Sequence, residues 1–139
     1  MNKTFVVSVI VMFVVSSIAG FVVHGMLLGA DYARLTFFRS NTEFMEHYAA
    51  MAAANLIWAV GFTWIYRQGR DARAFVGQGV RFGIAVALLA VIPTYLIYYA
   101  VQPMPSDLVA EQIVLDTIAM VIMGVIVAAL NRDASPARA

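Results

Sequence analysis

The chain has 139 residues, of which 63% are hydrophobic and only 12% are charged. Soluble domains carry about 45–50% apolar and about 25% charged residues, so this is the composition of a membrane protein. The net charge of +1 gives no basis for nucleic-acid binding, and the absence of cysteine excludes disulfides, thiol nucleophiles and cysteine-ligated metal centres.

The first apolar segment covers residues 5–30, between Lys3 and Asp31, and is long enough to cross a bilayer as a helix. Its first part resembles a signal peptide, because Ser17-Ile18-Ala19 has the small-x-small pattern of a cleavage site. The apolar run continues well past that point, however, so we expect a retained span. Residues 31–46 then mix aromatic and charged side chains, which is typical of a segment at the headgroup level.

Three further spans are expected. Residues 47–66 form the second, in which alanines at four-residue spacing favour close helix packing. A basic, glycine-containing loop is expected over residues 67–81. The third span, residues 82–101, is interrupted by Pro93, which removes a backbone donor and usually kinks a helix. The fourth span covers residues 107–130.

The basic residues predict the topology. With a cytoplasmic N-terminus, seven of the nine basic residues lie inside: Lys3, Arg67, Arg70, Arg73, Arg81, Arg132 and Arg138. Only Arg34 and Arg39 lie outside, which is a strong positive-inside bias. We therefore expect one transmembrane domain over residues 1–139 in a bacterial cytoplasmic (inner) membrane. Its fold class is all-α, an antiparallel up-down-up-down bundle of four transmembrane helices with both termini cytoplasmic.

Each span carries a polar side chain at a similar depth in the outer half of the membrane. At about 1.5 Å of rise per residue, these side chains lie roughly 9–13 Å below the outer ends of their helices. A carboxylate in hydrocarbon costs roughly 2.5–3.5 kcal/mol on insertion scales, so Asp116 should face protein or water and have a partner. Residues four apart share a helix face, so Gln112 lies beside Asp116 and Tyr99 beside Tyr95. The candidate ligand-binding residues are His24, Asn55, Tyr95, Tyr99, Gln112 and Asp116.

Three interpretations of this polar layer remain open. It could fix helix packing, for example through a His24–Asp116 bond. Interhelical polar contacts are worth only about 0.6 kcal/mol on average, yet they fix the register and the partner of a helix. It could line a ligand pocket between helices. It could also hold a metal, because imidazole and thioether groups gather toward the outer side, or a haem between His24 and His47. The residues concerned are His24, Met26, Met45, His47, Met51 and Met104.

No enzyme motif is present: GxSxG, HExxH, GxxxxGK[ST] and GxGxxG are all absent. We therefore expect a non-enzymatic accessory subunit or binding protein, with an undetermined cofactor, within a membrane-protein complex or as a homo-oligomer. The alternative is a membrane enzyme or redox-linked protein that binds a quinone, lipid, haem or metal in the same polar site.

Three stretches carry a family resemblance: FVVHGMLL at residues 21–28, RFG at residues 81–83 and YAVQPMP at residues 99–105. With them the chain resembles a family of small four-span bacterial inner-membrane proteins, along nearly its whole length. That resemblance implies a fold and a location but no activity. The size and span count are also similar to those of small, oxidoreductase-associated membrane proteins of the DoxX type, which is an analogy without a shared motif.

Overall fold

The computed structural model describes residues 2–71 and 74–132, and all regular structure within these ranges is helical. Four helical segments are long and apolar enough to cross a membrane: Lys3–Leu27, Tyr48–Gly69, Phe75–Val101 and Ser106–Asn131. The expectation of an all-α protein with four helices able to span a membrane is therefore confirmed. Arg73 and Arg138, which contribute to the charge bias, lie outside the described residues.

The first span joins α1 (Lys3–Gly20) to a π-helical segment, η1 (Phe21–Leu27). The Asn2 side chain caps α1 by accepting a hydrogen bond from the Thr4 amide at 3.0 Å. In the π-helical turn, the Leu28 amide donates to the Val23 carbonyl, five residues earlier. His24 lies within this turn.

The link between the first two spans contains two short helices, α2 (Gly29–Tyr32) and α3 (Asn41–Glu46). Ser40 and Glu43 form a capping box at the start of α3. The hydrogen bonds from the Ser40 amide and then the Ser40 hydroxyl lower the pKa of the Glu43 carboxyl below its ordinary value. The second span, α4 (Tyr48–Gly69), follows directly.

The third span consists of α5 (Phe75–Val86), η2 (Ala87–Val91) and α6 (Ile92–Val101). It begins at Phe75 rather than at residue 82, so the expected loop at residues 67–81 is largely helical. Pro93 does not end the helix. Its ring would clash with the carbonyl four residues earlier in an α-helix, and the π-helical turn immediately before it provides the additional room.

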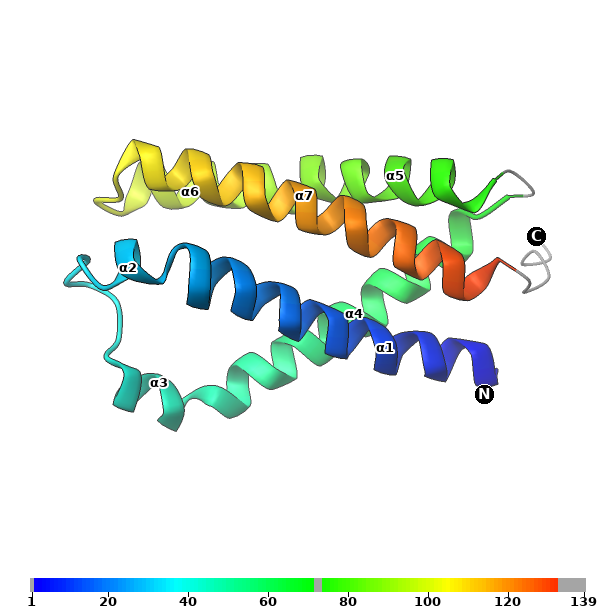
Figure 1. The fold of residues 1–139 in the computed structure, drawn as a ribbon, viewed down its shortest axis with the longest axis horizontal. Helices are drawn as coiled ribbons and strands as arrows, with labels where there is room; N and C mark the ends of the chain where they lie inside the picture. The colour runs from blue at the N-terminus through cyan, green and yellow to red at the C-terminus, as the bar shows by residue number, and fades with distance from the viewer. Residues whose placement is uncertain (1, 72–73, 133–139) are drawn as a thin grey trace.

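Helix α7 (Ser106–Asn131) packs most extensively against α5, and the two lie side by side in Figure 1. Glycines allow this close approach. A Cβ atom on Gly83 would lie 2.5 Å from the Met120 carbonyl oxygen, and one on Gly79 would lie 2.6 Å from the Val125 Cα. Gly79, which was expected in a loop, and Gly83, which was expected in the third span, therefore bring two helix backbones together.

Helix α4 crosses α1 obliquely and diverges from it toward α3 (Figure 1). The main core lies where α1, α4 and α7 meet, and it includes Met12, Phe62, Met123 and Val127. Large apolar side chains are exposed along all four spans. An apolar exterior of this kind is expected for helices that face lipid.

Candidate functional site

The Asp116 carboxylate on α7 contacts side chains from two other elements. The Tyr95 hydroxyl of α6 donates a hydrogen bond to one carboxylate oxygen. The other oxygen lies 3.4 Å from Nε2 of His24 in η1. The Asp116 side chain is only 16% exposed. Asp116 therefore has the protein partners that a carboxylate at this depth requires.

Tyr32 of α2 extends this network. Its hydroxyl lies 2.7 Å from Nδ1 of His24 and accepts a hydrogen bond from Nε2 of Gln112 at 2.8 Å. Burial raises the pKa of the Tyr32 phenol above its ordinary value; the Gln112 bond opposes this rise and the Asp116 charge adds to it. Tyr32 is therefore a hydroxyl donor throughout the physiological pH range.

Donor and acceptor capacities give the network one consistent direction when His24 is neutral. Gln112 donates to the Tyr32 oxygen, so the Tyr32 hydroxyl hydrogen is available to Nδ1 of His24. A neutral His24 that accepts at Nδ1 carries its proton on Nε2, which faces Asp116. The Tyr95 hydroxyl donates to the same carboxylate. All donors thus converge on the Asp116 carboxylate.

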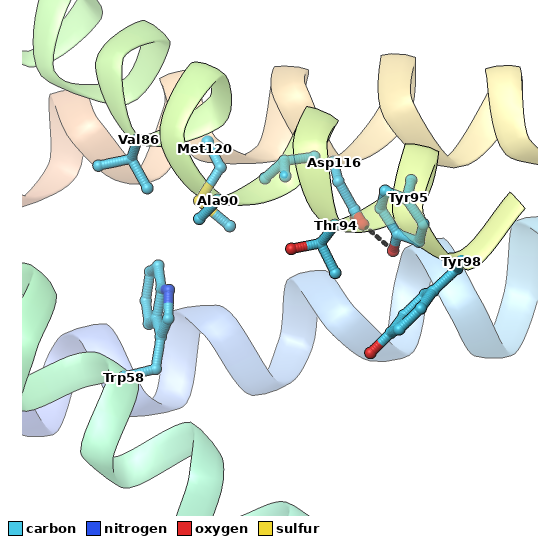
Figure 2. Close-up of a pocket in the computed structure, with 9 residues that line it drawn as sticks. Trp58, Val86, Ala90, Thr94, Tyr95, Tyr98, Asp116 and Met120 are labelled. Carbon is cyan, nitrogen blue, oxygen red and sulfur yellow. Dashed lines mark hydrogen bonds between the residues drawn. The ribbon is translucent and has the colours of Figure 1, made fainter. Parts of the chain in front are cut away.

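A cavity of about 300 Å³ adjoins this carboxylate (Figure 2). Figure 2 shows the Trp58 indole on one side of it and Asp116, Tyr95 and Tyr98 at its other end. The cavity is lined by Trp58, Val86, Ala90, Val91, Thr94, Tyr95, Tyr98, Asp116 and Met120. Its volume is at the lower limit of ordinary small-molecule pockets, which are about 300–1,000 Å³. Tyr95 and Asp116 belong to both the cavity and the polar network.

Both π-helical segments contribute to this region. Segment η1 carries His24, and η2 contributes Ala90 and Val91 to the cavity wall. π-helical turns are rare and occur frequently at functional sites. Their positions on two different helices, on either side of Asp116, mark this region as the candidate site.

The six candidate residues do not all meet. His24, Tyr95 and Asp116 are in direct contact, and Gln112 joins them through Tyr32. Asn55 instead bonds to α1, accepting from Ser16 at 3.0 Å and donating to Ser17 at 2.8 Å. Tyr99 is 50% exposed and has no polar contact among the described residues.

Sequence reasoning missed Tyr32 and the cavity wall. It placed Tyr32 in the interfacial link, because the sequence after residue 30 is polar and aromatic. The single turn of α2 instead folds Tyr32 back against His24, with the ring centroids 5.9 Å apart. Trp58, Thr94 and Tyr98 became candidates only through helix packing, which the sequence pattern does not specify.

The metal and haem interpretations gain no ligand set. Among residues 2–71 and 74–132, no three His, Cys, Asp or Glu side chains are placed to share a metal ion. Nδ1 of His47 lies 2.8 Å from the Glu43 carbonyl, within its own helical turn. Met104 is buried among apolar side chains, whereas Met26 and Met45 are exposed.

Comparison with protein-family models, with curated proteins and with solved structures gives no match to this chain. The site itself combines one carboxylate, an aromatic wall and an apolar floor within the membrane-spanning segments. A mostly apolar wall with a few polar groups is the usual composition of small-molecule pockets.

Proposed function

We propose that this chain is a small multi-pass protein of a bacterial cytoplasmic membrane that binds an amphiphilic ligand beside Asp116. It acts as a binding protein or accessory subunit rather than as an enzyme. The observation that supports this function is the placement of the Asp116 carboxylate at the wall of a cavity between membrane-spanning helices. An intramembrane ionisable group is costly, and it commonly marks a binding or transport site.

We also propose the orientation. The four spans form an antiparallel up-down-up-down bundle with both termini in the cytoplasm, so that the Asp116 site lies toward the outer surface. The support is the excess of Lys and Arg in the segments assigned to the inside. The links after the second and third spans are also short, which is typical of antiparallel neighbours.

The chemistry of the cavity defines the ligand class. The Asp116 oxygens accept hydrogen bonds, so the ligand head group carries a donor or a positive charge. Trp58 and Tyr98 offer aromatic faces to a ring or a cation. Val86, Ala90 and Met120 surround the apolar part. Thr94 and Tyr98 are exposed, so the cavity reaches the outer surface of the helices where lipid would lie.

A quinone is the second candidate, and the hydroxyl groups in the wall favour it. Thr94 and Tyr98 can donate to quinone carbonyls, and the aromatic wall fits a planar ring. A quinone would make this a redox-linked protein. Solvent extraction of the purified protein, followed by an oxidised-minus-reduced absorption spectrum, separates the two candidates.

The test is purification in mild detergent, with mass spectrometry of the molecules that remain bound. Asp116→Asn and Asp116→Leu are compared with Asp107→Asn, which changes an exposed carboxylate on the same helix. We expect all three variants to fold, and both Asp116 variants to lose the ligand. Asp107→Asn should keep it. Retention of the ligand by Asp116→Leu would overturn the proposal.

The accessory role has a separate readout. A protein partner that co-purifies with the chain in a constant ratio supports that role. If the partner remains while no small molecule is bound to the wild-type protein, the polar network serves packing and the ligand proposal fails. Replacing a buried ionic group by an apolar one is often tolerated, so Asp116→Leu would then be stable.

A further inference from the structure

A second polar region lies at the opposite end of the spans from Asp116, where α4 ends. The Arg67 guanidinium lies over the Phe5 ring, 5.6 Å from its centroid, at the start of α1. Nη1 of Arg70 donates to the backbone carbonyl of Asn131 at 2.9 Å, at the end of α7. Three helix ends therefore meet around two arginines.

The α7 side of this region is firmly held. The Asn131 side chain is 1% exposed and donates to the Ser8 hydroxyl at 3.1 Å and to the Val127 carbonyl at 2.8 Å. Ser8 itself is fully buried. The carbonyl that accepts from Arg70 thus belongs to a fixed residue, and Arg70 is positioned in advance of any ligand.

Each of the two guanidinium groups has one buried donor without an acceptor in the described part of the chain. Nη1 of Arg67 and Nε of Arg70 are buried and have no hydrogen-bond partner in the described part of the chain. No carboxylate there forms an ion pair with either arginine. Burial, and then the charge of Arg67, lower the pKa of the Arg70 guanidinium below its ordinary value. Two neighbouring cations with unsatisfied buried donors require an anion.

We propose that Arg67 and Arg70 bind the phosphate group of an anionic phospholipid at the membrane surface. Arginine presents a planar fork of donors that matches a phosphate group in a bidentate geometry. The pair lies at the end of a membrane span, at Gly69, which is the level of the lipid head groups. Trp64 and Ile65 are exposed just below, where they can contact the glycerol and the acyl chains.

This proposal is independent of the Asp116 ligand, since the two sites share no residue. With the orientation proposed above, the lipid belongs to the cytoplasmic leaflet. That leaflet carries the anionic lipids that attract basic segments. Inorganic phosphate offers the same chemistry to the two arginines, so the test must separate the two sources.

The experiment is native mass spectrometry of the full chain in neutral detergent, titrated with dioleoyl phosphatidylglycerol or dioleoyl phosphatidylcholine. We expect the wild-type protein to bind phosphatidylglycerol at least about tenfold more tightly. The double variant R67Q/R70Q should lose this preference. R39Q, which removes one exposed charge from the link between α2 and α3, should keep it.

Equal binding of the two lipids by the wild-type protein would overturn the proposal, whatever the variants do. Retention of the preference in R67Q/R70Q would also overturn it. The single variant R67Q is measured as well, in case R67Q/R70Q misfolds. Nη1 of Arg67 has no protein acceptor, so R67Q breaks no hydrogen bond at that atom. Inorganic phosphate, added at the lipid concentration, should not displace phosphatidylglycerol. Displacement would assign the pair to free phosphate and refute the lipid.

Discussion

The contact between α5 and α7 leads to a quantitative prediction for Gly124→Ala. A Cβ atom at Gly124 would overlap the Gly79 carbonyl oxygen and would lie 2.9 Å from the Gly83 nitrogen. All of these atoms belong to the backbone, so no side-chain rotation relieves the overlap. The two helices must separate instead. Carbon atoms pack best at about 3.5–4.0 Å, and the Gly83 Cα atom would lie only 3.1 Å from the new Cβ, so the shortfall there is about 0.4–0.9 Å.

Overpacking of this kind typically costs about 1–3 kcal/mol, and we expect a value near the upper end because the atoms are backbone. Gly61→Ala is the matched control. It lies in α4, where an added Cβ meets nothing within 4 Å. Both variants gain the same helix propensity, about 1 kcal/mol. The difference between them therefore isolates the steric cost.

The assay is unfolding in detergent by titration with sodium dodecyl sulfate, followed through the fluorescence of Trp58 and Trp64. We expect Gly61→Ala to be neutral or stabilising and Gly124→Ala to be destabilised. The same stability in both variants would refute close backbone packing between α5 and α7. Because α5 and η2 help to form the cavity, Gly124→Ala should also weaken ligand retention.

Three further predictions concern the polar groups. Tyr32→Phe removes the partner of both His24 and buried Gln112, so it should cost about 1–3 kcal/mol of unfolding free energy, whereas Tyr99→Phe should cost nothing measurable. Asn55→Ala should lower the unfolding free energy by about 0.6 kcal/mol, and at most by about 1.7 kcal/mol. Ligand retention should be unchanged, because Asn55 bonds only to α1. Loss of the ligand would contradict the separation of Asn55 from the Asp116 network. The depressed pKa of Glu43 means that its capping box stabilises α3 above the ordinary value of 4.5 and that this stabilisation is lost as the pH falls through the lower folded pKa. Amide exchange in α3 should therefore increase, relative to α7, as the pH falls from about 6 to about 3, and Glu46→Gln should not alter this dependence.

Hydrophobicity alone was sufficient to predict the four spans, because the bilayer imposes one length on every crossing helix. The predicted start of the third span was wrong, because glycine can either interrupt a helix or allow two helices to pack closely. In water Gly77 and Gly79 would favour a loop, whereas against α7 the missing side chain at Gly79 is a packing advantage. The sequence does not show which helix faces a glycine, so this outcome could not be predicted.

The candidate site was predicted only in part. Counting residues from the expected helix ends placed His24, Asn55 and Asp116 in one layer, but Asn55 bonds to Ser16 and Ser17, which lie about two helical turns from His24 along the first span. Asn55 turns toward the two serines of α1 instead of toward Asp116. Tyr99 shares a face with Tyr95 but lies a full helical turn, about 5.4 Å, nearer the helix end, where it is exposed.

The π-helical turn at η1 contains one residue more than an α-helical turn. Elsewhere in a span, the loss of one residue rotates everything beyond it by about 100° and removes its packing face from the bundle. Deletion of Gly25 would instead convert the five-residue hydrogen bond between Leu28 and Val23 into an ordinary four-residue one. Among related chains, single-residue length differences in this helix should therefore be concentrated between residues 21 and 27, where they change the presentation of His24 and leave the rest of the span in register.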